Sequence, residues 1–431
     1  MSSPLAEPAS PRTLGDWLRW QERLHSQEIQ LGLERVRAVA DRLDLLPLPF
    51  PVVTVGGTNG KGSSIAILSS ILRAAGQRVA VYTSPHLVRY NERIVVDGSE
   101  VADDELCAAF ELVENRRGDA ALTYFEYGTL AALLVFKQAA PDIAVLEVGL
   151  GGRLDAVNIV DATVALVTAI DIDHTQWLGD TRDAIAREKA GIFRAGRPAV
   201  CSDPDAPAAL IETAREVGTP LELLGVEFRY ERDGERWHWW SRDREYLDLP
   251  LPGLEGEYQL RNAAGALRVL DHLRDVAPVD AAAVVEGLGS VELPGRFQRI
   301  DGSPECYLDV AHNDQSAGEL ARNLVAKPCA GRTFFLLGML KDKDARAFVA
   351  TLNDVADEWH VADLHVARAA DRAELERVVS GVAGNGKAVL GHANVEAAYA
   401  AIAGRTRPGD RIVVTGSFIT VSQMMAARGI A

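Results

Sequence analysis

A glycine-rich loop carries the clearest chemical signal in the sequence. It runs from Gly56 to Ser63 (GGTNGKGS), between a β-branched segment and an apolar stretch of helical character. Glycines let consecutive backbone N–H groups converge on one anion, and the positive end of the following helix lies at the same place. Lys61 adds a point charge for the β- and γ-phosphates of a nucleotide. We therefore predict a phosphate-binding loop, the alternative being a glycine-rich turn with a solvated lysine.

The loop departs from the strict P-loop consensus at two positions. Val55 stands where the first glycine is expected, and Gly62 separates Lys61 from Ser63. These departures point away from ordinary GTPases and kinases. A dinucleotide site fits poorly, because neither this loop nor Gly149–Gly152 has the GxGxxG spacing.

An acid ends one of the predicted strands. Glu147 follows the apolar segment 143–146, and the carboxyl end of a parallel strand is the edge where α/β sheets bind ligands. Near a triphosphate, a carboxylate at this edge is a natural Mg²⁺ ligand. The alternative is an acid that caps the following loop.

Other polar side chains follow neighbouring strands. Ser84 ends one predicted strand, where its hydroxyl is a candidate ligand; the alternative is a serine that only forms the turn. Asp171, Asp173 and His174 follow another predicted strand. A lone histidine is usually structural, but beside two acids at a strand end we expect contact with a ligand or a phosphate. Lys189 lies late in a predicted helix, and by charge alone it belongs to a solvated face.

The elements that position these residues alternate between strands and helices, which is typical of a parallel sheet with crossover helices. An unusual stretch at 221–250, rich in Trp, predicts a hairpin around Asp233-Gly234 whose aromatic residues serve packing. A domain boundary is expected near 293–299, after which the strand–helix rhythm restarts. We predict helices over 13–44, 65–75, 103–117, 127–139 and 257–290, and strands at 52–55, 78–82, 143–146, 163–168, 198–201, 305–310, 333–338, 358–362, 386–390 and 411–415.

Composition narrows the class of protein. The chain has 431 residues, of which 48% are hydrophobic and 25% charged, as in a soluble globular protein of two or three domains. The net charge of −16 argues against a nucleic acid or an anionic membrane as the main partner. Four dispersed cysteines and an N-terminus without an apolar signal core indicate a reduced, cytoplasmic protein.

Taken together, the motifs resemble those of the folylpolyglutamate synthases, within the muramoyl-peptide ligase superfamily. The likeness covers about residues 13–425, and the motifs occur in the family's order. Segments 91–93 and 123–127 look most like the bacterial bifunctional members, dihydrofolate synthase/folylpolyglutamate synthase. The motifs that carry the resemblance are Gly57–Ser63, Ser84–His86, Glu147–Asp155, Asp173-His174 and Glu188–Gly191.

The resemblance implies a fold and a set of site residues. The fold class is α/β: a P-loop-containing parallel-sheet ATPase domain over 1–296, followed by a smaller Rossmann-like domain over 297–431. Lys61, His174, Lys189 and Arg296 would be catalytic. ATP would contact Gly57, Thr58, Asn59, Gly60, Lys61, Gly62, Ser63, Asn262, Arg296 and Asp309; a pterin would contact Thr123, Tyr124, Phe125, Glu126, Leu154, Asp155 and Ala156; Mg²⁺ would be held by Ser84, Glu147, His174 and a carbamylated Lys189. No firm role follows for His312.

The implied reaction is ATP-dependent amide formation. ATP would activate a carboxylate as an acyl phosphate, which the amine of L-glutamate attacks, with dihydropteroate and tetrahydrofolates as acceptors. The co-substrate would be ATP with Mg²⁺ at two sites, and we expect a monomer. The alternatives are a muramoyl-type or other amino-acid ligase with a different acceptor, which usually carries an extra N-terminal domain, and a non-enzymatic nucleotide-dependent switch.

Overall fold

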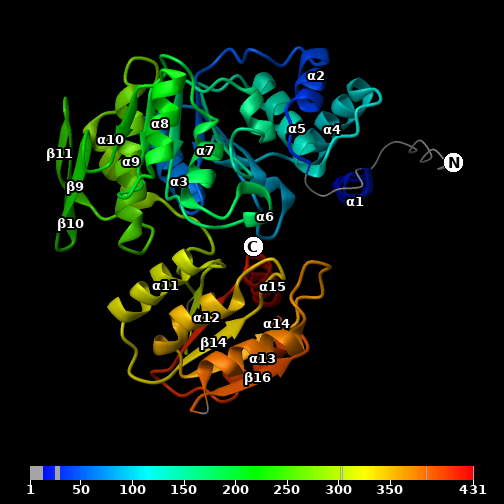
Figure 1. Cartoon of the computed structure of the whole chain (residues 1–431), viewed down its shortest axis with the longest axis vertical. Helices are drawn as coiled ribbons and strands as arrows, with labels where there is room; N and C mark the ends of the chain where they lie inside the picture. Colours follow the sequence, from blue (N-terminus) through cyan, green and yellow to red (C-terminus); the bar gives the residue numbers. More distant parts are fainter. Residues whose placement is uncertain (1–12, 25–29, 301, 303, 385, 431) are drawn as a thin grey trace.

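The chain folds into two lobes that face each other across a cleft (Figure 1). The computed structural model describes residues 13–24, 30–300, 302, 304–384 and 386–430. The helical pattern predicted over 13–44 forms two helices, and its part at 25–29 lies outside the described residues. No helix in the described ranges combines the length and the apolar character needed to cross a bilayer.

The first lobe is built on an eight-stranded sheet. Its strand order is β4-β3-β2-β5-β1-β6-β7-β8, parallel from β2 to β8, with β3 and β4 antiparallel. The elements are α1 (Leu14–Leu24), α2 (Glu34–Arg42), β1 (Val52–Gly56), α3 (Lys61–Ala74), β2 (Val79–Tyr82), η1 (Tyr90–Arg93), β3 (Ile94–Val96), β4 (Ser99–Glu100), α4 (Asp103–Arg117), α5 (Tyr124–Ala139), β5 (Ile143–Glu147), η2 (Ala156–Ile159), β6 (Val164–Val167), α6 (Thr175–Leu178), α7 (Arg182–Ala190), β7 (Ala199–Cys201), α8 (Ala208–Val217) and β8 (Leu221–Leu223).

Alternate side chains of the buried strands point to opposite faces of this sheet, and each face packs into a core of its own. Val53 and Val55 point to one face, where they pack against α3, while Val52 belongs to the opposite core beneath α4 and α5. Both faces are covered by helices, so the strands read as continuous apolar runs. A third core lies between helices α7 and α8 and strands β6 and β7, on the same face of the sheet as the core beneath α4 and α5.

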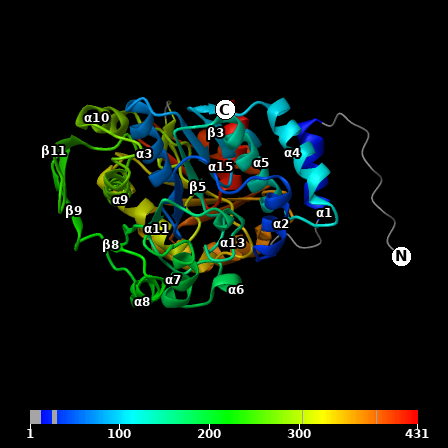
Figure 2. The ribbon, with the colours of Figure 1, turned by 90° about the horizontal axis from the view of Figure 1, so that it is seen from above.

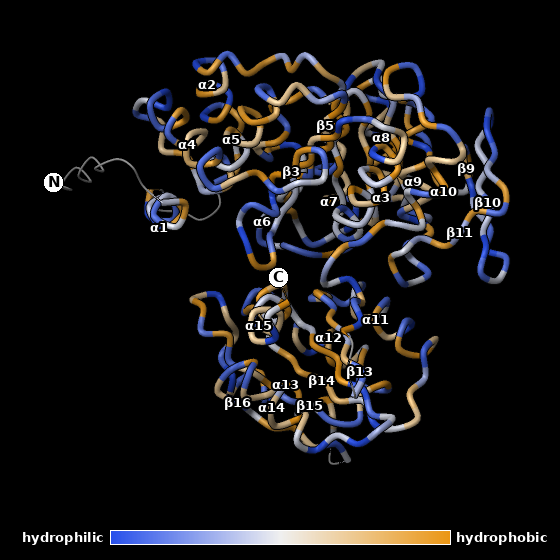
Figure 3. The backbone as a smooth tube through the Cα atoms, turned by 180° about the vertical axis from the view of Figure 1, so that it is seen from behind, coloured by the Kyte–Doolittle hydropathy of each residue, from blue (hydrophilic) through white to orange (hydrophobic). Residues whose placement is uncertain are grey.

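The Trp-rich stretch forms a separate three-stranded antiparallel sheet. Its strands are β9 (Phe228–Asp233), β10 (Arg236–Ser241) and β11 (Glu245–Pro250), in the order β11-β10-β9, and it stands at one edge of the lobe (Figure 2). Trp237 and Trp239 are fully buried, and their indole N–H groups donate to the carbonyls of Pro250 and Ala264. The predicted packing role of these aromatics is confirmed. The outer ends of the sheet are hydrophilic (Figure 3).

Two further helices complete the first lobe and lead to the second. They are α9 (Tyr258–His272) and α10 (Ala281–Ser290), which pack against α3. The second lobe is a six-stranded sheet of order β12-β13-β17-β14-β15-β16, parallel except for β12. Its elements are β12 (Gln298–Ile300), β13 (Glu305–Leu308), α11 (Asp314–Ala326), β14 (Thr333–Leu337), α12 (Ala345–Leu352), η3 (Asn353–Val355), β15 (Glu358–Ala362), α13 (Arg372–Ala383), β16 (Ala388–His392), α14 (Val395–Ala403), β17 (Arg411–Thr415) and α15 (Phe418–Arg428).

The predicted α/β class and the alternation of strands and helices are confirmed. Helix α3 begins four residues earlier than the sequence indicated, at Lys61, because the glycine-rich loop leads directly into its first turn. The antiparallel edge strands β3, β4 and β12 were not predicted, since strands of two or three residues carry little periodicity. The domain boundary at 296/297 stays a prediction.

Candidate active site

Strand order explains why the predicted site residues meet. β1 lies between β5 and β6, and β2 lies on the far side of β5. Because these four strands are parallel, their carboxyl ends share one edge of the sheet. Ser84 follows β2, Glu147 ends β5, the glycine-rich loop follows β1, and His174 follows β6.

The glycine-rich loop is fixed against the end of β6. The backbone N–H of Thr58 donates to the carbonyl of Ala169 (2.7 Å), and the hydroxyl of Thr168 donates to the carbonyl of Asn59 (2.7 Å). Gly57 has a φ of 151°, and a Cβ there would stand 1.8 Å from Oγ1 of Thr168. Only glycine fits a loop held this closely with that backbone conformation.

The lysine of the loop folds back over it. Lys61 Nζ donates to the carbonyls of Gly57 (3.0 Å) and Thr58 (3.2 Å). The ammonium therefore lies where the loop's backbone and the N-terminus of α3 also concentrate positive potential. This arrangement is suited to the terminal phosphates of a nucleotide.

Glu147 is a buried carboxylate beside this positive site. Its Oε2 accepts the backbone N–H of Ser84 (2.9 Å), and its other oxygen has no hydrogen-bond partner among the described residues. Burial raises the pKa of Glu147, while the charges of Lys61 and Arg296 act in the opposite direction. A free carboxylate oxygen at this position is a suitable ligand for a hard cation.

Lys189 is a buried lysine on α7. Burial, followed by repulsion from Lys61, lowers the pKa of its ammonium to about 7. The loop after β5 packs against the same turn of the helix, where the N–H of Arg153 donates to the carbonyl of Glu188 (2.8 Å). The sequence, which placed Lys189 on a solvated face by charge alone, gave the wrong environment, because packing of this loop covers the helix.

His174 begins the short helix α6 in a left-handed conformation, with a φ of 51°. Burial lowers the pKa of its imidazole to about 4, so the ring is neutral at physiological pH and a nitrogen is available as a ligand. No three His, Cys, Asp or Glu side chains of the described ranges gather as a metal-ligand group. The predicted metal donors thus depend on Ser84 and Lys189 as well as on Glu147 and His174.

The predicted pterin segments line the same cavity. Glu126 is largely used within the protein, since Oε2 accepts the N–H and the hydroxyl of Thr123 and Oε1 accepts from Arg35 (3.0 Å). It forms a capping box for α5. Asp155 accepts the N–H groups of Leu150 and Val157, and burial raises its pKa to about 7.

The connection between the lobes contributes Arg296 and the residues that hold it. The guanidinium of Arg296 lies over the ring of Phe418, 5.0 Å from its centroid. Asp309 accepts the N–H groups of Phe297 (2.9 Å) and Ala311 (2.8 Å), and burial raises its pKa to about 6. Asp309 therefore fixes the connecting segment to the end of β13 in the second lobe.

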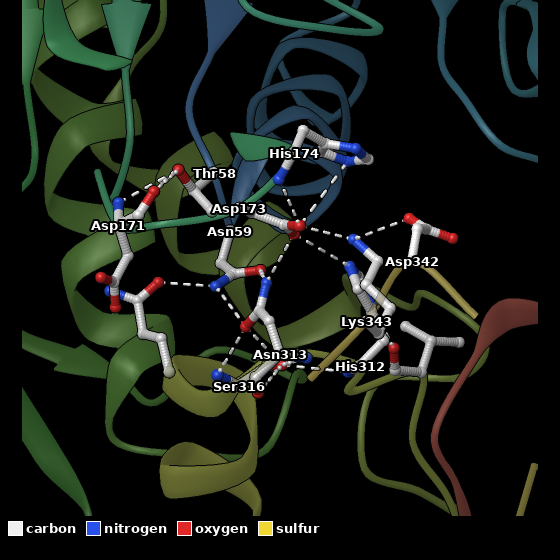
Figure 4. A network of polar contacts seen from close by, with 12 residues as sticks. Thr58, Asn59, Asp171, Asp173, His174, His312, Asn313, Ser316, Asp342 and Lys343 are labelled. Atoms are coloured by element: carbon white, nitrogen blue, oxygen red, sulfur yellow. Dashed lines mark hydrogen bonds and ion pairs between the residues drawn. The ribbon is translucent and has the colours of Figure 1, made fainter. Parts of the chain in front are cut away.

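A network of polar contacts joins the two lobes at the phosphate loop (Figure 4). Asp173, after β6, accepts from Lys343 Nζ (2.5 Å) and from Asn313 Nδ2 (3.0 Å), and His312 Nε2 lies 3.6 Å away. Burial raises the pKa of Asp173, but His312, His174 and Lys343 outweigh it and bring the pKa well below its usual range. Asp173 is therefore an interdomain anion that also lines the cavity, and its contact with a ligand or a phosphate stays a prediction.

The phosphate loop takes part in this network. Asn59 Nδ2 donates to the side-chain oxygens of Asn313 (3.1 Å) and Gln315 (2.6 Å), both from the second lobe. Sequence reasoning missed Lys343, Asn313 and Gln315. The signal for Lys343 was present in Lys341–Asp344, a polar run that begins three residues after a predicted strand, but nothing local indicates its partner on the other lobe.

The phosphate loop, Glu147, His174, Lys189, Arg296 and the predicted pterin segments line one cavity of about 1110 Å³ between the lobes. Asn262 closes it behind the phosphate loop, where its Oδ1 lies 2.6 Å from the position of a Cβ on Gly60. The structure brings every site residue that the resemblance implied to this cavity, including Gly62, Ser63, Tyr124, Phe125, Leu154 and Ala156, whereas Asp171 does not line it.

Comparisons with known proteins define the class. The Mur ligase middle domain matches residues 55–270, and the Mur ligase glutamate ligase domain matches residues 295–418. A phosphate-loop lobe followed by a ligase lobe is thus the two-domain Mur ligase architecture.

The relatives narrow the class to one family. The chain is 45% identical to the dihydrofolate synthase/folylpolyglutamate synthase of Escherichia coli, covering 97% of this chain and 96% of the relative, and 38% identical to that of Haemophilus influenzae, covering 96% and 97%. The chain belongs to the dihydrofolate synthase/folylpolyglutamate synthase family, which confirms the predicted family and its class, an ATP-dependent ligase.

Solved structures agree over the whole fold. E. coli FolC in complex with DHPP and ADP gives a TM-score of 0.93 at 44% identity, covering 98% of this chain and 99% of that one. A bifunctional folylpolyglutamate synthase/dihydrofolate synthase with Mn, AMPPNP and L-glutamate bound gives 0.90 at 43% identity, with coverage of 98% and 99%.

Proposed function

We propose that this protein joins L-glutamate to dihydropteroate, forming dihydrofolate, and to the glutamate tail of tetrahydrofolates, at the expense of ATP. The observation that carries the proposal is the single interlobe cavity, in which the phosphate loop, Glu147, Lys189 and the segments around Phe125 and Asp155 face one another. Relatives that match along the whole chain bear both activities in their names.

The chain's own groups would position the phosphate that is transferred. A carboxylate oxygen is a poor leaving group, so the acceptor must first be activated as an acyl phosphate. Lys61 and Arg296 supply positive charge on the two sides of the phosphate loop, and such fixed charges favour phosphoryl transfer. The second lobe, held by Asp173 and Asn59, would keep water from the acyl phosphate.

The donor set fits magnesium. Ser84 and Glu147 would hold one Mg²⁺, and His174 with a carbamylated Lys189 would hold another. The ions would neutralise phosphate charge and orient the acceptor. Glu147 has a carboxylate oxygen without a protein partner, and His174 is neutral, as ligation requires. A structure of a relative with Mn bound supports a divalent ion at this cavity.

The environment of Lys189 favours carbamylation. An ammonium does not react with carbon dioxide, but a free amine does, and a pKa of about 7 leaves a substantial share of the side chain as the amine at neutral pH. The modification would convert a cation into an anion that binds metal. It would also remove the repulsion between Lys189 and Lys61.

The pterin would lie between the segments around Phe125 and Asp155. Asp155 has a pKa near 7 because of burial, so its carboxyl group can donate or accept a hydrogen bond to a heterocycle near neutral pH. Glu126, in contrast, would act mainly by fixing the first turn of α5. This assignment keeps Thr123 and Glu126 in the pterin site but gives them a positioning role.

The deciding experiment measures phosphate release with Mg-ATP and L-glutamate, with dihydropteroate or tetrahydrofolate as acceptor. Release with both acceptors is expected. Release with tetrahydrofolate alone would limit the protein to polyglutamylation, and no release from protein that binds ATP would favour a different acceptor or a nucleotide-dependent switch. We also propose that the protein is a monomer, which gel filtration tests, and that it acts in the cytoplasm, where its four unpaired cysteines stay reduced.

A further inference from the structure

Arg93 is a buried arginine with an unusual set of neighbours. It ends η1, directly before β3, and its carbonyl accepts the N–H of Thr83 (2.9 Å), so it lies beside the end of β2 next to Ser84. The residue is 9% exposed. Its Nε donates to Nδ1 of His86 (2.8 Å).

Two aromatic rings hold the guanidinium in place. Its central carbon lies 5.3 Å from the ring centroid of Tyr90 and 5.6 Å from that of Tyr124. These contacts and the bond to His86 restrict the plane of the group and leave its two terminal amino groups without a hydrogen-bond partner among the described residues. An arginine fork fixed in this way is prepared for a bidentate contact.

No carboxylate among the described residues forms an ion pair with Arg93. Arg268, the other buried arginine described in the first lobe, is paired with Glu222 and Asp271. Burying an unpaired cation is costly, so an anion supplied by a ligand would offset that cost. Arg93 lines the interlobe cavity, so such an anion can reach it.

The position of Arg93 in the fold distinguishes between two candidate anions, the phosphates of the nucleotide and a carboxylate of the acceptor. The phosphates belong to the loop after β1, and β5 lies between that strand and β2, which ends near Arg93. Tyr124, against which the guanidinium packs, begins α5 in the segment assigned to the pterin acceptor. The acceptor is therefore the anion that best fits this side of the cavity.

We propose that Arg93 binds a carboxylate of the pterin acceptor, and that it is a binding and specificity residue of this enzyme. The inference rests on the proposed function. Dihydropteroate has one carboxylate, the one that reacts, whereas a tetrahydrofolate also has the α-carboxylate of its terminal glutamate. Either carboxylate satisfies the chemistry of the site, and the two are separated by experiment.

The test compares Arg93→Gln with Arg89→Gln. Arg89 is exposed beside the same turn, and among the described residues its ion-pair partners are Glu100 and Asp103 at the surface, so its replacement controls for the loss of a charge near η1. We expect Arg93→Gln to raise the KM for the acceptor by about 10- to 100-fold, the range for a charge-assisted hydrogen bond. The KM values for ATP and L-glutamate should not change, and Arg93→Lys should restore part of the loss.

The two acceptors identify the bound carboxylate. A raised KM for both acceptors means that Arg93 holds the carboxylate that reacts, and a raised KM for tetrahydrofolate alone means that it holds the α-carboxylate of the tail. If the KM for neither acceptor changes, or if only that for L-glutamate changes, the inference is wrong. Wild-type protein without turnover on any acceptor would instead refute the proposed function.

A binding measurement tests the inference even where a variant's folding or turnover is impaired. Calorimetric titration without ATP compares dihydropteroate with its methyl ester on folded wild-type protein and on each variant. We expect wild type and Arg89→Gln to prefer the free acid and Arg93→Gln to bind the two equally, because the ester removes the charge that Arg93 recognises. An unchanged preference for the acid in Arg93→Gln, together with a KM for tetrahydrofolate equal to that of the wild type, would overturn the inference.

Discussion

The carboxylate of Asp173 and the ammonium of Lys343 lie 2.5 Å apart across the boundary between the two lobes, and both side chains are at least nine-tenths buried. The pair stands next to His174 and within the same network as Asn59 of the phosphate loop (Figure 4). Closure of the cavity and the geometry of the phosphate loop therefore depend on the same few contacts.

Asp173→Asn should weaken the contact between the lobes. The substitution keeps the size of the side chain but removes the carboxylate charge nearest to Lys343, and among the described residues it leaves the buried ammonium only the longer ion pair with Asp342. We expect a larger radius of gyration by small-angle X-ray scattering and a fall in kcat of about tenfold or more, since closure positions the reactants. Asp342→Asn is the control, because that carboxylate is 4.0 Å from Lys343. An unchanged radius in both variants would show that other contacts keep the lobes together.

Gly57→Ala should abolish ATP binding. The new Cβ would stand 1.8 Å from Thr168 Oγ1, so the loop must move away from the end of β6. Gly76→Ala is a matched control, because Gly76 also has a positive φ (78°) but has open space around it. Both variants should lose about 1–2 kcal/mol of unfolding free energy through backbone strain. Only Gly57→Ala should lose nucleotide affinity in a calorimetric titration; equal loss in both would mean that strain, not the clash, is responsible.

Lys189→Ala should nearly abolish turnover, and added bicarbonate should not restore it, because the variant has no amine to carbamylate. Lys137→Ala, at the exposed end of α5, should retain activity and serves as the control. In the wild-type protein, ¹³C-bicarbonate should give a carbamate resonance that is absent from Lys189→Ala. Activity near the wild-type level in Lys189→Ala would remove the carbamate from the mechanism.

Glu222→Gln should destabilise the first lobe in a pH-dependent way. Burial raises the pKa of Glu222, but hydrogen bonds from Arg268 and His272 outweigh it and lower the pKa to about 2. Because the folded pKa is below the ordinary value of 4.5, the carboxylate stabilises the fold fully above about pH 4.5, and this contribution is lost as the pH falls towards 2.

Urea unfolding at several pH values tests this prediction. The free energy of unfolding of Glu222→Gln should be about 2 kcal/mol below that of the wild type at pH 7, and the difference should shrink between pH 4.5 and 3. Glu227→Gln, in the nearby turn, controls for the loss of one negative charge. A difference that does not depend on pH would show that Glu222 acts through packing alone.

The sequence was informative wherever function is local to a strand end. Glu147 could be predicted as a site residue because it ends a five-residue apolar strand, and Lys61 because its loop lies between a strand and a helix. Parallel strands bring such ends together by topology, so a correct alternation of elements already assembles most of the cavity.

Contacts between distant segments could not be read in the same way. The local sequence shows only that Asp173 is an acid next to a histidine. The partners of Asp173, Asn313 and Lys343, lie in the other lobe, and their approach depends on how the lobes dock. In the sequence, Arg93 stands out only within segment 91–93, which resembles the family, because its burial depends on Tyr90 and Tyr124 packing around it. Glu126 shows the opposite case, where a local capping box explains much of a residue assigned to the ligand.

The place of β1 in its sheet has a consequence for biosynthesis. Both of its neighbours, β5 (Ile143–Glu147) and β6 (Val164–Val167), come much later in the chain. During translation the phosphate loop therefore has no partner for its anchoring bonds until Thr168 and Ala169 have left the ribosome. A nascent chain shorter than this cannot hold the loop in its ligand-binding form, so nucleotide can stabilise the first lobe only after that point in synthesis.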